Sequence, residues 1–257
     1  MPPARVYNHV NPLALVLSLL VSVPSTAAQS GSAAAPFNPG ERLEYTLSYG
    51  LLPAGTMTTR VVGLEEFDGR PAYHFLFEAK TNRAVGFVYQ LESREESWFD
   101  ARELYSLRYR RTTVENDKPR NKDVRFDQER NLQIEGGESN PTSPRAVDQV
   151  AIIYYLRTLH LSPGARHVLR NMPDPDDNPL VIRVLRRERI RVAAGTFETF
   201  LVDLDLRTDS GLFKEGGENR VWITADDRHI PVRISSKVGP AHIQVELVDF
   251  DGGRPVD

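Results

Sequence analysis

The sequence predicts a mainly β protein in which a single antiparallel, strongly curved sheet, a barrel or half-barrel, surrounds one buried helix. About twelve segments have the alternation or the apolar content of strands. Turns of modest length that contain Gly, Pro or Asp separate these segments. Only residues 147–159 have the composition of a substantial buried helix. Because strands and helices do not alternate along the chain, a parallel sheet is not expected.

Residues 1–28 have the pattern of an export signal. Arg5 lies near the start, an apolar run extends over Leu13–Val23, and small residues end at Ala28. This order of basic, apolar and small residues is typical of a signal that is removed on export. The apolar run is short for a membrane span, and Pro24 follows it directly, so an uncleaved anchor is the weaker interpretation. We expect cleavage near Ala28, a periplasmic location and no transmembrane segment afterwards.

The composition argues against several classes of protein. The chain has no cysteine, and therefore neither disulfides nor the acylation site of a bacterial lipoprotein. Its formal charge is −3, which becomes −4 when Arg5 is removed with the signal (−3 − 1). This weak acidity argues against nucleic acid as a partner. No cofactor is expected, and the oligomeric state stays open.

The remaining chain is predicted to be one domain. Residues 29–40 are rich in Ser, Ala, Gly and Pro, which is typical of a flexible leader. Residues 41–257 show no change of composition that would mark a linker, so we expect a single β-rich domain.

Five or six clear strands and two shorter ones are expected before the helix. In the first, apolar Leu43 and Tyr45 alternate with polar residues, as in a half-buried strand. Asp68-Gly69 is a typical hairpin turn. The expected strands are Arg42–Tyr49, Thr56–Gly63, Tyr73–Lys80, Phe87–Ser93, Leu104–Thr113, Val124–Phe126 and Leu132–Ile134.

Residues 147–159 are predicted to be a helix packed on the concave side of the sheet. The segment has no polar face, which indicates that it is covered on most sides. A buried strand would have a similar composition, so length and cap signals favour the helix. Asp148 resembles a cap, and Ser143-Pro144 could supply a cap and a first-turn proline.

The chain after the helix is expected to return to strands. A loop rich in proline and aspartate, Pro173–Pro179, comes first. The expected strands that follow are Leu180–Leu185, Arg187–Ala193, Thr196–Arg207, Val221–Thr224, Val232–Ser236 and Ile243–Phe250.

Four short motifs occur in an order that resembles a known family. They are the strand Glu41–Gly50 with its Pro53-Ala54-Gly55 turn, Tyr154-Tyr155-Leu156-Arg157, Ala194-Gly195-Thr196-Phe197, and Val221-Trp222-Ile223 before Ile230-Pro231-Val232-Arg233. With these, nearly the whole mature chain resembles the DUF3108 family of exported proteins from Gram-negative bacteria. The resemblance implies a periplasmic β-rich protein without assigned site residues. Its architecture resembles the curved sheets of periplasmic lipid and lipoprotein carriers.

Known catalytic and metal-binding motifs do not occur in the sequence. There is no Gly-x-Ser-x-Gly motif, so a serine hydrolase is disfavoured. Asp174, Asp176, Asp177 and Asn178 could supply oxygen ligands for calcium, but their spacing fits no standard calcium loop. A solvated surface loop is therefore favoured, with calcium left open. The histidines are too scattered for a zinc site: His74, His160, His167, His229 and His242.

Arginines at alternate positions of a strand could bind an anion. Arg187, Arg189 and Arg191 share one face of a predicted strand, where three guanidinium groups could hold phosphate or carboxylate. A solvated strand face gives the same pattern and is favoured. The same alternatives apply to Arg108, Arg110 and Arg111.

The functional hypothesis depends on the aromatic residues of the predicted inner face. Most are expected to fill the core, but Tyr suits a cavity that is apolar along its wall and wet at its mouth. We predict a non-enzymatic, periplasmic binding or chaperone-like protein for an apolar or amphipathic envelope molecule, either a lipid or an outer-membrane precursor. Arg157 would meet an anionic head group.

The alternative is an envelope hydrolase that acts on cell-wall glycan through carboxylates that the sequence does not identify. The inward aromatics include Tyr89 and Tyr109, and the predicted ligand-binding residues are Tyr45, Tyr49, Tyr73, Phe75, Phe77, Tyr154, Tyr155 and Arg157.

Overall fold

The computed structural model of the chain describes residues 35–86, 90–207, 213, 215–238 and 241–254, which belong to the compact unit Ala34–Asp257. The predicted export signal, half of the predicted leader (residues 29–34) and the first three residues of the predicted strand Phe87–Ser93, which include Tyr89, lie outside the described residues.

Most of the described chain is strand. The strands that precede the main helix are β1 (Glu41–Tyr49), β2 (Leu52–Phe67), β3 (Arg70–Thr81), β4 (Leu91–Asp100), β5 (Ser106–Glu115), β6 (Lys118–Asp127), β7 (Leu132–Glu135) and β8 (Glu138–Pro141). The strands that follow it are β9 (Arg166–Leu169), β10 (Leu180–Val192), β11 (Gly195–Asp205), β12 (Asn219–Thr224), β13 (Pro231–Val238) and β14 (Ala241–Gly252). The helical elements are α1 (Arg83–Gly86), α2 (Ala151–Arg157) and the 3₁₀ turn η1 (Pro175–Asp177).

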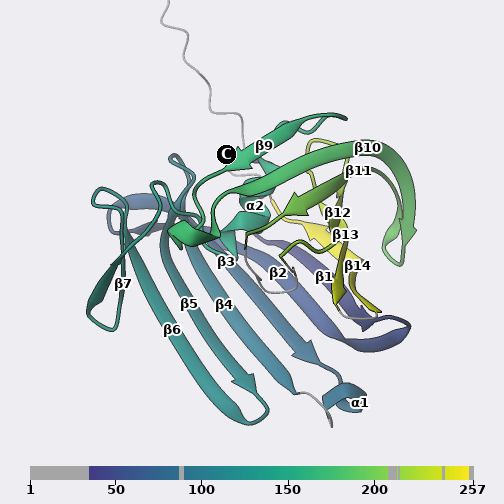
Figure 1. The fold of residues 1–257 in the computed structure, drawn as a ribbon, viewed down its shortest axis with the longest axis horizontal. Helices are drawn as coiled ribbons and strands as arrows, with labels where there is room; N and C mark the ends of the chain where they lie inside the picture. Colours follow the sequence, from purple (N-terminus) through teal and green to yellow (C-terminus); the bar gives the residue numbers. More distant parts are fainter. Residues whose placement is uncertain (1–34, 87–89, 208–212, 214, 239–240, 255–257) are drawn as a thin grey trace, which may run out of the picture. The chain divides into compact units, whose positions relative to one another are not determined.

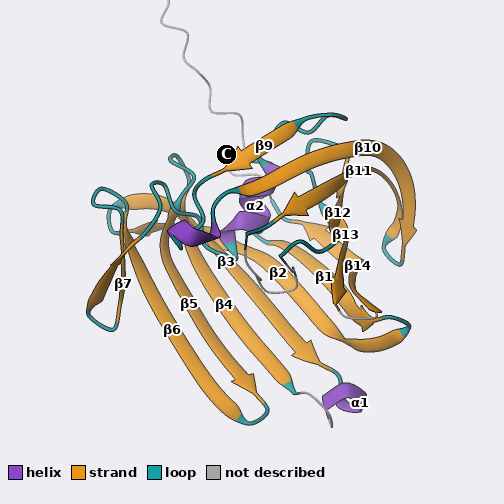
Figure 2. Cartoon of the chain, in the orientation of Figure 1, coloured by secondary structure: helices purple, strands orange, loops and turns teal. Residues whose placement is uncertain are grey.

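These strands form one antiparallel sheet of 14 strands (Figures 1 and 2). Their order is β8-β7-β6-β5-β4-β3-β2-β1-β14-β13-β12-β11-β10-β9, so the first half of the sheet meets the second where β1 pairs with β14. The prediction of a mainly β protein with one antiparallel sheet and one main helix is confirmed.

The sheet is neither closed nor strongly curled, so the predicted strongly curved sheet, a barrel or half-barrel, is wrong in its curvature and closure. Among the described residues, β8 and β9 are the two ends of the strand order and do not pair with each other. Hydrogen bonds between loops connect the segments beside them instead. The Thr142 hydroxyl donates to the carbonyl of Pro173 at 2.6 Å, and the Asn178 amide donates to the Ser143 hydroxyl at 2.9 Å.

Helix α2 is shorter than predicted, with 7 residues against the predicted 147–159. Asp148 acts as the expected cap, because its Oδ1 accepts from the backbone N–H groups of Val150 and Ala151 at 2.8 and 2.9 Å. The alternative start at Ser143-Pro144 is wrong. Residues 143–148 are irregular, and Asp148 fixes their end by also accepting bonds from two serines of the sheet, Ser97 and Ser106, at 2.6 Å each.

Most predicted strands occur, with changes at their ends. The two strands predicted over residues 180–193 are one strand, β10, with a register shift between Val184 and Arg186. Strands β8 and β9 and helix α1 were not predicted, because their sequences are short and polar or mixed. The Asp68-Gly69 turn joins β2 to β3, and its positive φ angles of 48° and 77° fit a hairpin of the predicted kind.

Helix α2 packs on one face of the sheet between its two halves (Figure 1). Tyr154 stacks on Phe75 of β3, with ring centroids 3.8 Å apart, and Phe37 packs edge-on against both rings. Ile152 and Tyr155 contact the apolar side chains of both halves. The helix therefore fills part of the space beside the sheet, and the remainder is the cavity described below.

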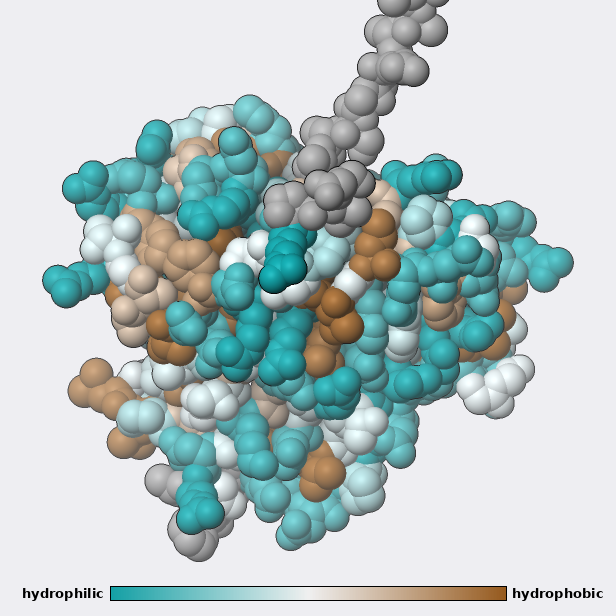
Figure 3. All heavy atoms as spheres, turned by 180° about the vertical axis from the view of Figure 1, so that it is seen from behind, coloured by the Kyte–Doolittle hydropathy of each residue, from teal (hydrophilic) through white to brown (hydrophobic). Residues whose placement is uncertain are grey.

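The view from behind shows mainly hydrophilic side chains, with hydrophobic ones in scattered groups (Figure 3). No helix among the described residues has both the length and the apolar character needed to cross a membrane.

Candidate functional site

A cavity of about 240 Å³ lies beside α2 and is lined by residues from both halves of the sheet. Most of its wall is apolar. The second half contributes side chains of β10 to β13, and α2 contributes one row. The apolar residues of these two groups include Leu180, Leu204, Val221, Ile223, Ile152, Ile153 and Leu156. The cavity is slightly smaller than the roughly 300 Å³ at which ligand pockets usually begin, so its size suits a single narrow chain or a small molecule.

Three polar side chains occur among the described lining residues: Glu95 on β4, Arg111 on β5 and Gln149 before α2. Glu95 and Arg111 are direct neighbours across the two strands. The first half of the sheet therefore supplies the charged side chains of the lining as well as the apolar Met57 and Phe77, whereas the lining side chains of β10 to β13 are apolar. Such an arrangement can accommodate a molecule with one apolar and one polar part.

Glu95 is held in a network of hydrogen bonds. Its Oε2 accepts from the Tyr109 hydroxyl at 2.6 Å and from Gln149 Nε2 at 2.9 Å, and its Oε1 accepts from the Ser93 hydroxyl at 3.0 Å. Burial raises the pKa of Tyr109, and the nearby Glu95 carboxylate raises it further, so the phenol stays protonated and donates. Gln149 also donates to the Tyr109 oxygen.

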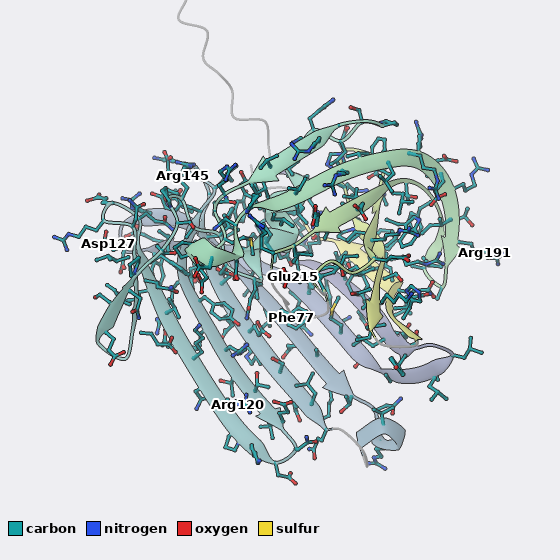
Figure 4. The ribbon with its side chains drawn as sticks, in the orientation of Figure 1. Phe77, Arg120, Asp127, Arg145, Arg191 and Glu215 are labelled. Carbon is teal, nitrogen blue, oxygen red and sulfur yellow. The ribbon has the colours of Figure 1, made fainter. Side chains whose placement is uncertain are left out.

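Phe77 alone among the predicted ligand-binding residues lines the cavity. Its ring, on β3, packs against the apolar residues of both halves of the sheet. Figure 4 shows Phe77 near the middle of the sheet, below α2. Its predicted role as part of the wall remains a prediction that agrees with this position.

The other predicted aromatics lie in the core or near its margin. Tyr45, Phe75 and Tyr154 are buried, and the Tyr45 hydroxyl donates to the carbonyl of Pro231 at 3.0 Å. Tyr73 and Tyr155 are partly buried and pack against the same core. Tyr49, in contrast, is 40% exposed at the end of β1. None of these aromatic residues is among those that line the cavity.

Arg157 does not approach the cavity mouth as predicted. Its side chain is completely buried and forms an ion pair with Glu41, whose side chain is only 3% exposed. The guanidinium is held there by its partners: Glu41 at the start of β1 and the carbonyls of Pro36 and Arg228 surround it. Arg157 therefore has a structural role and does not line the cavity.

The two arginine groups considered as anion sites have different surroundings. Arg187 and Arg189 are exposed and both pair with Glu198, and Arg191 lies at the outer side of β10 (Figure 4). Arg108 and Arg110 both pair with Asp123 on the face opposite the cavity. Arg111 points to the other face, because neighbouring residues in a strand alternate.

The acidic loop is organised by its own hydrogen bonds. The Asp174 carboxylate accepts from the backbone N–H of Asp176 at 2.9 Å, and Asn178 Oδ1 accepts from that of Met172 at 3.0 Å. Within the described part of the chain, no three or more His, Asp or Glu side chains gather as they would around a metal ion.

Glu95 and Gln149 were not predicted as site residues, and Arg111 was considered only in a group with Arg108 and Arg110, for which a solvated strand face was favoured. Arg111 lies close in the sequence to Arg108 and Arg110. The alternation of side chains along the strand is the one sequence signal that places Arg110 and Arg111 on opposite faces. Glu95 lies in a strand with many acidic residues, and Gln149 precedes a helix whose start was not located. Their proximity depends on strand register and on the position of α2, which no local pattern records.

One solved structure with a similar fold agrees with the architecture described above. The chain is similar to a β-barrel-like protein of the DUF1849 family from Brucella abortus, with a TM-score of 0.52 and 10% identity over 84% of this chain and 98% of that chain. Weaker similarity is found to the hypothetical protein CT021 from Chlamydia trachomatis (TM-score 0.39, 7% identity, 84% and 88% covered). A DUF1089 family protein from Pseudomonas aeruginosa is also similar (TM-score 0.32, 15% identity, 76% and 90% covered).

No curated protein matches the sequence. The family model described as "Protein of unknown function (DUF3108)" matches residues 44–248, which include all strands except the ends of the first and last. The resemblance noted in the four motifs is therefore confirmed, and the chain belongs to the DUF3108 family.

Proposed function

We propose that this protein is a non-enzymatic periplasmic carrier that shelters an apolar or amphipathic envelope molecule, such as a lipid or an outer-membrane precursor. In this proposal the sheet carries α2 on one face, and the cavity beside the helix holds one apolar chain. The observation that carries the proposal is the cavity wall: among the described residues it is apolar on β10 to β13 and α2, and polar only at Glu95, Arg111 and Gln149.

The surroundings of Glu95 favour binding over hydrolysis. A glycan hydrolase of the usual kind needs two carboxylates that flank the scissile bond. Glu95 is the sole carboxylate among the described residues that line the cavity, and its oxygens already accept hydrogen bonds from Ser93, Tyr109 and Gln149. The hydrolase alternative therefore has no specific observation in its favour.

A series of single-chain amphiphiles of increasing length tests the proposal. Each methylene buried against the wall contributes roughly 0.8 kcal/mol, so affinity should increase with chain length until the cavity is full. Isothermal titration calorimetry on the mature protein measures this dependence. A site that binds only anions would instead depend strongly on salt and little on length.

Phe77→Asp places a charge on the cavity wall and should abolish the dependence on chain length. Thr112→Asp is the matched control, because Thr112 is exposed on the opposite face of β5. This control should bind like the wild type. Affinity that ignores both chain length and Phe77→Asp would reject the proposal and leave Phe77 as a core residue.

A further inference from the structure

Arg111 is a cation at the edge of an apolar cavity. Its Nε is buried and has no hydrogen-bond partner, and the side chain forms no ion pair with any of the residues that the structure describes. The neighbouring Arg108 and Arg110 behave differently, since Asp123 pairs with them at 2.5 and 3.6 Å. Buried donors without acceptors are rare in folded proteins and call for an explanation.

The adjacent carboxylate does not satisfy Arg111, although strand register places the two residues opposite each other. The Glu95 oxygens accept hydrogen bonds from Tyr109, Gln149 and Ser93. These three bonds orient the carboxylate toward their donors. The other cross-strand neighbour of Arg111 is Lys122, which is also a cation. The guanidinium therefore keeps its donors available on the cavity side.

A guanidinium carries its donors in a planar fork that matches the two oxygens of a carboxylate or phosphate. An oxyanion near Arg111 would accept the hydrogen bond that Nε lacks. The opposite wall, which includes Leu180, Val221 and Ile223, offers no hydrogen-bond donors from its side chains. The two walls thus require different chemistry from the two ends of one ligand.

We propose that the ligand of this cavity is a single-chain amphiphile with an oxyanion head, a carboxylate or phosphate, which Arg111 binds while the chain lies against β10 to β13 and α2. This inference rests on the proposed carrier function and specifies its ligand. Gln149, whose amide already donates to Glu95, also lines the cavity.

The experiment compares octanoate, octyl phosphate, octanol and octylamine, which share one chain and differ in the head group. Displacement of a neutral fluorescent apolar probe gives their affinities. We expect both anions to bind at least about tenfold more tightly than octanol, the order expected for hydrogen bonds to a charged group. Acetate and inorganic phosphate, which lack the chain, should bind at least about tenfold more weakly than the octyl anions.

Arg111→Gln should reduce the affinity for the two anions to that for octanol and leave octanol binding unchanged. Arg111→Lys keeps the charge and should restore part of the preference for anions. Arg110→Gln is the matched control, because Arg110 precedes Arg111 and lies on the opposite face, and it should bind like the wild type. Circular dichroism melts establish that each variant is folded. If Arg111→Gln does not fold, Arg111→Lys is compared with the wild type instead. A weaker preference for the anions in Arg111→Lys then supports the role of Arg111.

The outcomes separate this inference from the function on which it rests. Equal affinity for octanol and the anions overturns the role of Arg111 while the carrier function stands. Tightest binding of octylamine would assign the head group to Glu95 and also overturn it. If no octyl compound displaces the probe, both proposals fail. If acetate or phosphate binds as tightly as the octyl anions, the chain contributes nothing to binding. That result overturns the proposal that the ligand is an amphiphile.

Discussion

The Arg157 guanidinium and the Glu41 carboxylate form a bidentate ion pair, with Nη1–Oε1 and Nη2–Oε2 distances of 2.6 and 2.8 Å, in a completely buried position. Arg157 Nε donates to the carbonyl of Arg228 at 3.0 Å, and Nη2 also donates to that of Pro36 at 2.7 Å. The pair therefore connects the end of α2 to the start of β1 and to the loop before β13.

Glu41→Gln should lower the free energy of unfolding by about 3–5 kcal/mol, because it leaves the Arg157 charge buried without a counterion. Urea unfolding of the wild type and the variant measures this difference. Glu44→Gln is the control on the same strand, since Glu44 pairs with Arg42 at the surface, and it should cost at most about 1 kcal/mol. Equal effects of the two substitutions would show that the buried pair does not stabilise the fold.

Asp148 should give the stability a defined pH dependence. Burial raises its pKa above the usual 3.8, although hydrogen bonds from Ser106 and Ser97 oppose the shift. Between the unfolded and folded pKa values the folded protein keeps a proton that the unfolded chain releases, so this group's contribution to the free energy of unfolding falls as pH rises. Below the unfolded value the contribution is fully present.

Asp148→Asn removes this titration. The stability difference, wild type minus variant, should therefore decrease as pH rises from about 4 and become constant above the folded pKa. Urea unfolding of both proteins between about pH 4 and pH 7 gives this difference. A difference that increases with pH would mean that the folded protein stabilises the ionised carboxylate, contrary to the expected direction.

Gly55 is required where β2 passes close to β3. A Cβ atom at this position would clash with the carbonyl oxygen of Lys80, so the backbone must shift to accept any side chain. Gly55→Ala should cost about 1–3 kcal/mol, as overpacking usually does. Gly63→Ala on the same strand is the control, because its Cβ would meet nothing within 4 Å. Chemical unfolding compares the two, and equal midpoints would contradict the steric argument.

Export and cleavage can be tested directly on the protein from an envelope fraction. The basic, apolar and small-residue zones of residues 1–28 predict that the mature chain begins at Gln29. Intact mass spectrometry measures the N-terminus. A chain that retains Met1 would refute the predicted cleavage.

Much of the fold could be predicted because its signals are local. The alternation of Leu43 and Tyr45 with polar residues located β1, and Asp68-Gly69 located a hairpin. The extent of α2 could not be predicted, because Val147 and Val150 are buried by tertiary contacts outside any helix. Closure of the sheet also depends on its two ends, where β8 and β9 have no local signal.

The site was less predictable than the fold. The inward row of Tyr73, Phe75 and Phe77 on β3 was predicted correctly as one face, and Phe77 is the member of this row that lines the cavity. The roles of Arg157 and Arg111 could not be distinguished from sequence. Their difference depends on which carboxylates lie nearby, and Glu41 lies 116 residues from Arg157 along the chain.

The pairing of β1 with β14 has a consequence for the time at which the protein can fold. Glu41 lies opposite Gly252, so the two halves of the sheet join through residues at the two extremes of the domain. Closing so long a loop carries a large entropic cost before contacts offset it, and folds with such non-local pairing form in milliseconds to seconds. Synthesis adds only about 5–20 residues each second, so the first half waits many seconds for its partner. The sheet and the cavity beside it can therefore be completed only when β14 is available to pair with β1.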